Sequence, residues 1–222
     1  MVAVPQIRGL TIVLIGDFNP TIFQPAWFAA QGFITDEEAR TAAIGIIHPD
    51  VTAFELSWLK LQVDRERFFS MCLAPPYFPQ VVETVCRTFE LLHHTPIKTL
   101  GITNEAHYRS ATIDKWHTLG NKLAPKEDWL PFFKQPGMRT LRIEQNPRPD
   151  GEEGHVQVTV EPSLRINPGV YLNVNDEIRG KGGAPLGAKL AVEKIQQRWP
   201  ETTEFSEKIF EHFATQIVAR HA

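Results

Sequence analysis

Glycines and basic residues are concentrated at positions 179–189 (RGKGGAPLGAK), a composition that can hold a phosphate group. We expect this segment to follow a strand and open a helix, where free amides and the positive helix end attract anions. The phosphate-loop motif needs lysine directly after its last glycine and then a hydroxyl residue. Here Ala188 separates Gly187 from Lys189, and Leu190 follows. The residues predicted to bind a phosphate-containing ligand, such as a nucleotide, are Arg179, Lys181, Gly182, Gly183 and Lys189. The alternative is a glycine-rich connection that binds nothing.

Histidines and loop carboxylates form a second group with chemical potential. A metal-dependent hydrolase needs three converging nitrogen or oxygen ligands and an open position. The histidine spacings match no motif such as HExxH. His93 and His94 would point about 100° apart on a helix, and imidazoles at a helix end can instead contact its free carbonyls. We therefore predict no metal ligand and no cofactor, and keep a metal hydrolase as a further alternative. The residues considered for it are Asp17, His48, Asp50, His93, His94 and His107.

Nucleophilic catalysis has no local motif in this chain. The GxSxG elbow is missing, and Cys72 and Cys86 lie in apolar runs that are typical of a reduced core. The serines considered are Ser57, Ser70, Ser110, Ser163 and Ser206. A triad assembled through space stays open, because triads are recognised by geometry and not by sequence position.

The composition is that of an ordinary globular protein. Of 222 residues, 42% are hydrophobic and 22% are charged, and the formal net charge is -3. A strongly basic nucleic-acid-binding face is therefore disfavoured, although a local patch stays open. Its candidates are Arg139, Arg142, Arg165, Arg179 and Lys181, diluted by Glu144, Glu152, Glu153 and Glu161. The start lacks a signal-peptide pattern, and no run of about eighteen apolar residues occurs. We expect a cytoplasmic protein with no membrane partner.

The apolar spacing of the first half predicts strands and helices in turn. Residues 9–15 are apolar on both faces, as in a covered strand. Helices are expected from Pro25 and from Thr35, which forms a capping box with Glu38. The parity of apolar residues slips at Trp58 and Leu59, which predicts a β-bulge within a single strand that ends at residue 63. A strand at 68–72 completes a hairpin.

The second half predicts a helix at 80–93 and a strand near 100–102. An irregular apolar stretch at 111–136 is interpreted as short helices laid over the sheet. Strands follow near 141–143, 156–160 and 170–174, with a solvated hairpin tip at 146–154. Two closing helices are expected at 186–199 and 203–219, the second with Phe205, Ile209, Phe213 and Ile217 facing inward.

Together these elements predict one α+β domain spanning residues 1–222. Its order is β-α-α-β-β-α-β, short helices, then β-β-β-α-α. The sheet is expected to be mostly antiparallel, with about six to seven strands and helices packed on it. The two halves could share a structure, although no internal repeat is visible.

An aromatic group around the first turn is the candidate partner-binding site. Phe18, Phe23, Trp27 and Phe28 surround it, and exposed aromatic residues often anchor interfaces. The alternative places all four in the core. With catalytic motifs missing, we predict a non-catalytic component that binds another protein; the sequence does not indicate an oligomeric state.

The order of elements and three further features resemble a group of uncharacterised bacterial α+β proteins. The three features are the GDFNP opening at 16–20, the HTPI and GITN segments at 94–97 and 101–104, and the Phe-rich last helix. The resemblance supports the α+β fold and implies no activity, because such families have none established. It suggests a component of a bacterial multi-protein system, for example a defence or toxin-related one.

Overall fold

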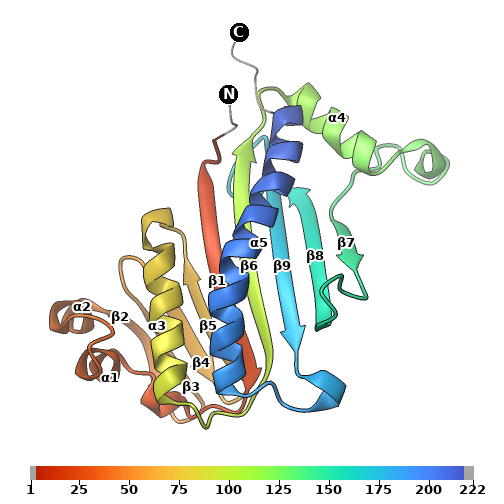
Figure 1. Cartoon of the computed structure of the whole chain (residues 1–222). Coiled ribbons are helices and arrows are strands. Elements are labelled where there is room, and N and C mark those ends of the chain that lie inside the picture. The colour runs from red at the N-terminus through yellow and green to blue at the C-terminus, as the bar shows by residue number, and fades with distance from the viewer. Residues whose placement is uncertain (1–3, 218–222) are drawn as a thin grey trace.

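The computed structural model describes residues 4–217, which form one nine-stranded antiparallel sheet with helices packed on it (Figure 1). The strands are β1 (Ile7–Gly16), β2 (Ala43–His48), β3 (Val51–Glu55), β4 (Lys60–Asp64), β5 (Arg67–Cys72), β6 (Ile97–Arg109), β7 (Leu141–Gln145), β8 (Glu153–Pro162) and β9 (Gly169–Arg179). The helices are α1 (Pro25–Ala30), α2 (Asp36–Thr41), α3 (Phe78–Leu91), α4 (Ile113–Leu123) and α5 (Ala188–Ile217). The predicted α+β class and antiparallel sheet are confirmed. No helix among these residues is both long and apolar enough to cross a membrane.

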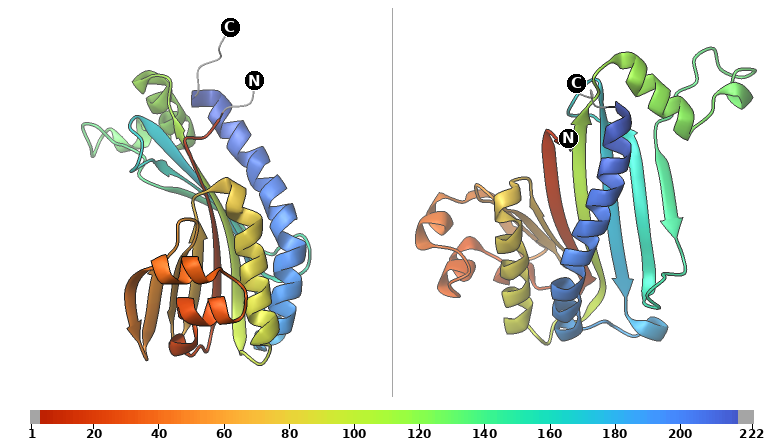
Figure 2. Two further views of the ribbon diagram at one scale, coloured as in Figure 1. Left: turned by 90° about the vertical axis from the view of Figure 1, so that its left-hand side faces the viewer. Right: turned by 45° about the horizontal axis from the view of Figure 1, so that its top comes forward.

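The two halves of the chain repeat one topological plan. The strand order is β2-β3-β4-β5-β1-β6-β9-β8-β7, so β1 and β6 lie side by side at the centre. Each of them is followed by a helical segment, a meander that returns from the edge of the sheet, and a closing helix. The central strands run antiparallel, with Ile12 opposite Ile102. The closing helices α3 and α5 lie on the same side of the sheet (Figure 2).

Strand alternation explains why one face of the sheet carries the helices. Leu10, Ile12 and Leu14 of β1 share one parity and are fully buried, as are Leu100 and Ile102 of β6. Helix α3 buries an apolar stripe against this face, which includes Val82, Val85 and Phe89. Fully burying an aliphatic side chain contributes about 1.5–3 kcal/mol, so this face holds the fold together. The opposite parity of β6 is mostly polar, whereas that of β1 includes Ile7, Val13 and Ile15.

The aromatic group around the first turn belongs to this core. Phe18, Phe23 and Phe28 are buried, and Trp27 is partly buried against them. Phe23 makes an edge-to-face contact with Phe68, with ring centroids 5.6 Å apart. The prediction of an exposed anchor is therefore wrong for these three phenylalanines, because the first turn and α1 close over the sheet beside α3.

The parity slip at Trp58 and Leu59 marks a turn between two strands, so the predicted bulge is wrong. Strand β3 ends at Glu55, β4 begins at Lys60, and the amide of Leu56 donates to the carbonyl of Leu59 at 2.7 Å. Trp58 and Leu59 fold back onto the core. This split and the unpredicted edge strand β2 raise the strand number from the six to seven expected to nine.

The two predicted closing helices form one helix, α5, with Pro200 inside it. Its buried residues in the second half are Thr202, Ser206, Phe210, Ala214 and Ile217. Phe205 is exposed instead of inward, while Ile209 and Phe213 are only partly buried. Small residues at 202, 206 and 214 face the sheet. The buried face of α5 is therefore rotated about the helix axis from the predicted face. Positions 218–219 of the predicted helix lie outside the described residues.

Candidate binding surfaces

The segment between α4 and β7, residues 124–140, projects from one corner of the sheet and is called the arm here (Figures 1 and 2). Helix α4 anchors its base. Thr112 caps the helix by accepting from the amide of Lys115 at 3.1 Å, and the indole of Trp116 donates to the carbonyl of Gly169 at 2.9 Å. Leu119 is buried. The prediction of helices laid over the sheet thus fits α4 and does not fit the arm.

The tip of the arm exposes a contiguous apolar run. Trp129, Leu130, Phe132 and Phe133 are 53%, 58%, 77% and 55% exposed. The run is held locally, because the carbonyl of Trp129 accepts from the amides of Phe132 and Phe133 at 3.0 and 2.9 Å. Large aromatic residues normally bury much of their surface, and contiguous exposed apolar patches mark interaction sites. The arm therefore presents a preformed apolar surface that the chain does not cover.

Two cavities lie beneath the arm. One of about 490 Å³ lies between α4, the arm and β8, with Trp116, Leu119, Met138, Val160 and Val170 in its wall. The other, of about 420 Å³, is lined by Trp129, Phe133 and Met138 among others. These volumes fall within the range of small-ligand pockets, about 300–1,000 Å³. Their mixed apolar and polar walls can receive the side chains of a partner or a small apolar ligand.

The face of the sheet opposite the helices carries hydrogen-bonded polar side chains. Thr103 donates to Asn175 at 3.1 Å, and Asn173 donates to the hydroxyl of Tyr171 at 2.8 Å. That hydroxyl donates to Glu105 at 3.1 Å. Burial and the nearby charge of Glu105 raise the pKa of Tyr171, so its proton stays in place. These groups satisfy one another's hydrogen-bonding capacity.

A serine–histidine contact at the end of this face was not predicted. Nδ1 of His107 lies 2.8 Å from Oγ of Ser163. That oxygen also accepts from the amides of Arg165 and Ile166 at 3.2 and 3.0 Å. Whether Oγ or Nδ1 donates in the serine–histidine contact depends on the imidazole tautomer. Burial, with the charge of Arg165, lowers the pKa of His107 and favours the neutral ring. Because two amides engage the serine oxygen, the contact holds the turn at residues 163–166.

The cysteines are poor nucleophiles as well. Both are free and buried. Burial raises the pKa of the Cys86 thiol to about 12, and it also raises the pKa of Cys72. The thiolate is the reactive form, so both behave as core residues, as predicted from their apolar surroundings.

The loop between β7 and β8 was expected to be a solvated hairpin tip, and this expectation is wrong for its Arg148. The side chain of Arg148 is fully buried and forms ion pairs with Asp150 at 2.6 Å and with Asp176 of β9. It also donates to the carbonyl of Glu177 at 2.9 Å. Asp176 lies on the helix-facing parity of β9, among apolar residues. A carboxylate in that position requires a partner, and the loop folds inward to supply one.

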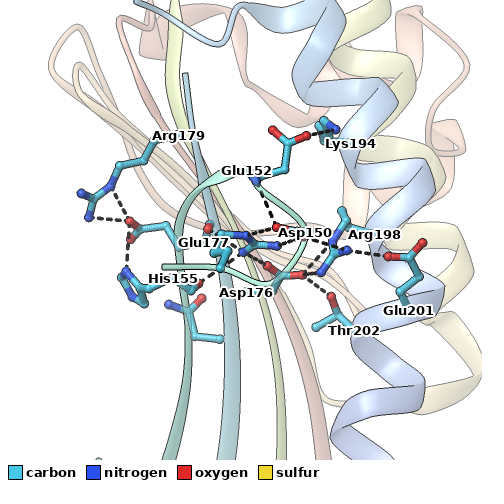
Figure 3. Close-up of polar contacts among 12 residues, drawn as sticks. Asp150, Glu152, His155, Asp176, Glu177, Arg179, Lys194, Arg198, Glu201 and Thr202 are labelled. Carbon is cyan, nitrogen blue, oxygen red and sulfur yellow. Dashed lines mark hydrogen bonds and ion pairs between the residues drawn. The ribbon is translucent and has the colours of Figure 1, made fainter. Parts of the chain in front are cut away.

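Helix α5 completes this polar clamp, which Figure 3 shows in close-up. Arg198 pairs with Asp176 at 2.9 Å and with Asp150 at 3.2 Å, and Thr202 donates to Asp176 at 2.6 Å. The hydrogen bond from Arg148 lowers the pKa of Asp150 to about 2. Cations and anions interleave within the clamp, so it binds the β7–β8 hairpin to β9 and α5 and offers no unmatched charge to a ligand.

The glycine-rich segment 179–189 uses its amides within the chain. The amide of Gly182 donates to the carboxylate of Glu153 at 2.7 Å, and the amide of Gly187 donates to the carbonyl of Ile97 at 2.8 Å. A side chain at Gly180 would meet the carbonyl of Ala184 at 1.9 Å. Close packing thus explains the glycine at position 180, while Gly182, Gly183 and Gly187 have positive φ angles that favour glycine. The carboxylate of Glu153 binds the amide of Gly182 where an anionic ligand would otherwise bind.

The basic side chains of this segment are turned outward or paired. Arg179 pairs with Glu177 at 2.6 Å, while Lys181 lies 4.0 Å from Glu152, which also binds Lys194 at 2.9 Å. Lys189 is exposed. A cavity of about 460 Å³ beside them is lined in part by Arg179, Lys181 and Lys194. The structure therefore brings Arg179 and Lys181 to one cavity and leaves Lys189 outside its wall.

The histidine group is dispersed over the fold. The rings of His93 and His94 contact each other in a tilted arrangement with centroids 4.0 Å apart, and His48 contacts Asp50 at 3.4 Å. Across residues 4–217, no group of three or more histidine, cysteine or acidic side chains could hold a metal ion. The metal-hydrolase alternative thus gains no structural support.

No protein-family model matches this chain, and no curated protein is significantly similar to it. Function must therefore be inferred from the surfaces described above.

Proposed function

We propose that this chain is a non-catalytic protein that binds another protein through the tip of the arm, residues 129–133. The observation that carries the proposal is the exposure of Trp129, Leu130, Phe132 and Phe133 in one run. Binding energy at interfaces concentrates in a few large side chains, with tryptophan and other aromatics prominent. The local turn holds these side chains ready, which reduces the entropy lost on binding.

A protein partner fits this surface better than nucleic acid does. Lys126 and Lys134 flank the tip, but Glu127 and Asp128 stand beside them, so residues 126–134 carry no formal net charge. Nucleic-acid binding depends on an excess of basic residues that contact phosphates. An uncharged aromatic surface with adjacent cavities is instead typical of protein recognition.

A non-catalytic role is supported by the state of the candidate nucleophiles. The oxygen of Ser163 is engaged by two amides, and the two thiols are buried with raised pKa values. We further propose that the protein works in the cytoplasm of a bacterium as part of a multi-protein system, for example a defence or toxin-related one. This context is supported by the resemblance of the GDFNP, HTPI and GITN segments.

A phosphate-containing ligand is the second candidate. It is favoured by the cavity that Arg179, Lys181 and Lys194 help to line. It is disfavoured by Glu152 and Glu177, which already pair with these cations.

The test of partner binding begins with a photo-crosslinking amino acid at position 132, introduced in the native host. Cross-linked proteins are identified by mass spectrometry, and the leading candidate is purified for calorimetric titration. We expect Phe132→Ser and Trp129→Ser each to weaken binding by about tenfold or more, the effect of a hot-spot residue. Leu164→Ser is the matched control, because Leu164 is 99% exposed on a different loop. Equal affinity of all three variants and the native protein would refute the proposal.

A further inference from the structure

The outer edge of β7 is a free strand edge. Strand β7 pairs with β8 on one side in regular register, and it is the last strand of the sheet on the other (Figure 1). Leu141 is half-buried and the other four residues are exposed, with Ile143 60% exposed. A free edge presents unpaired amide and carbonyl groups that can pair with another strand. Proline and bulges, which commonly block such pairing, do not occur in β7.

The sequence of β7, Leu-Arg-Ile-Glu-Gln, is complementary to itself in an antiparallel arrangement. With Ile143 on a twofold axis, Ile143 lies opposite its own copy. Arg142 then lies opposite Glu144 of the second copy, and this pair occurs twice. Both charged residues point to the polar face, since they pair with Thr159 and Gln157 of β8. Opposite charges directly across a strand pair are favourable, so the charges select this register.

Nothing in the described part of the chain uses these two charges. Neither Arg142 nor Glu144 forms an ion pair or a side-chain hydrogen bond within residues 4–217. Two charged residues of the neighbouring strands do have partners, because Glu177 pairs with Arg179 and Glu161 accepts a hydrogen bond from Thr140. We infer that β7 pairs with β7 of a second copy, which extends the two sheets into one.

The opposite edge of the sheet lacks the features that specify such a partner. Strand β2 exposes Ile44, Ile46 and Ile47, and it has no charged residue from Ala43 to Ile47 to fix a register. Its register with β3 also shifts between Ile44 and Ile46, and bulges of this kind blunt an edge. The self-complementary edge is therefore β7 and not β2.

The expected assembly is an isologous dimer with the helices of both copies on the same side. Only five residues of each copy form the strand pair, so the dimer should be reversible and depend on concentration. Each arm directly precedes β7, so the dimer carries two arms. Two linked arms can bind a partner that has two sites with increased avidity. The dimer itself requires no such partner.

Sedimentation velocity over a range of concentrations tests this inference with the full chain. The native protein should dimerise, and Arg142→Glu and Glu144→Arg should each weaken the dimer roughly tenfold or more, because like charges then face each other twice. Mixing these two variants should restore dimers, since position 142 of each chain would again face the opposite charge at position 144 of the other. The double variant Arg142→Glu/Glu144→Arg should also dimerise by itself. Ile46→Lys, at the other edge, is the control that should leave the dimer intact.

Three results would overturn the inference. The first is a native chain that stays monomeric up to its solubility limit. The second is a dimer that neither charge reversal weakens, and the third is a mixture of reversed variants that fails to associate. Circular dichroism of each variant shows that it is folded, which is expected because both positions are exposed. None of these outcomes depends on binding through the arm, which is measured separately with Phe132→Ser.

Discussion

Replacing Arg148 with alanine should strongly destabilise the fold, because the side chain is the buried centre of the polar clamp. The substitution removes the ion pairs with Asp150 and Asp176 and the hydrogen bond to the carbonyl of Glu177. Removing one partner of a buried ion pair costs about 3–5 kcal/mol. In this variant Asp176 retains its ion pair with Arg198 and its hydrogen bond from Thr202. We therefore expect a loss of unfolding free energy at the lower end of this range, about 3 kcal/mol. That is a large share of a typical stability of about 5–15 kcal/mol.

Urea unfolding at neutral pH measures this loss as a change in the free energy of unfolding. Two controls separate the clamp from the general loss of an arginine. Arg142→Ala removes an exposed arginine, and Arg179→Ala removes an exposed ion pair with Glu177. Exposed pairs contribute about 0–1 kcal/mol, so both controls should stay close to the native protein. Arg148→Met keeps much of the aliphatic bulk, which distinguishes lost packing from lost charge.

If Arg148→Ala lies within about 1 kcal/mol of the two controls, the clamp is not a stabilising unit. The hairpin would then be held by its strand pairing alone. A large loss in Arg148→Ala that Arg148→Met fully restores would assign the effect to packing and also contradict the electrostatic account.

Three more predictions concern the packing of α5, the pKa of Asp150 and the glycine-rich segment. In α5, Phe210 is 0% exposed and Phe205 is 43% exposed. Urea unfolding should show that Phe210→Ala lowers the free energy of unfolding by about 3–5 kcal/mol and Phe205→Ala by clearly less. Equal losses would contradict the assignment of Phe210 to the buried face of α5. Because the pKa of Asp150 is lowered from 3.8 to about 2, its stabilising effect is complete above about pH 4 and lost as the pH falls toward 2. Asp150→Asn should therefore flatten the acid limb of a stability-versus-pH curve, and an unchanged limb would count against the ion pair. Nucleotides and sulfate should leave the melting temperature of the protein unchanged, because Glu153 already binds the amide of Gly182. An increase in melting temperature that Lys181→Ala abolishes would instead favour a phosphate site. A ligand at about a hundred times its Kd would stabilise the fold by about 2.7 kcal/mol, which is readily measured.

The periodicity of apolar residues correctly predicted those strands and helices that have one apolar face and one polar face. The alternation Val170, Leu172, Val174 appears as the helix-facing side of β9, and Val158 and Val160 of β8 lie on the same side. It failed where a turn is made of apolar residues. Residues 56–59 (LSWL) contain no glycine, proline, asparagine or aspartate, and Ser57 alone is a weak turn signal. Tertiary packing of Trp58 and Leu59 closes the hairpin instead.

The two aromatic groups show why the binding surface could not be read from residue types. Phe18 and Phe23 lie in a turn, and so do Phe132 and Phe133, yet the first pair is buried and the second is exposed. The exposure of the two pairs differs because only the first turn can fold back onto the core of the protein. The first turn lies against α3 and β5, whereas the arm extends beyond the edge of the sheet. Local sequence does not encode that geometry.

One signal in the sequence could have identified the clamp. Asp176 shares the parity of Val174 and Ile178, and a carboxylate among buried apolar residues needs an internal partner. Arg148 supplies that partner from within the chain. The charges of β7 and the aromatic residues of the arm depart from the folding pattern in the opposite way. The charges form no ion pair among the described residues, and the aromatic side chains stay more than half exposed. A mismatch that the chain resolves internally stabilises the fold, and one that it leaves unresolved at the surface is where a second molecule is expected to bind.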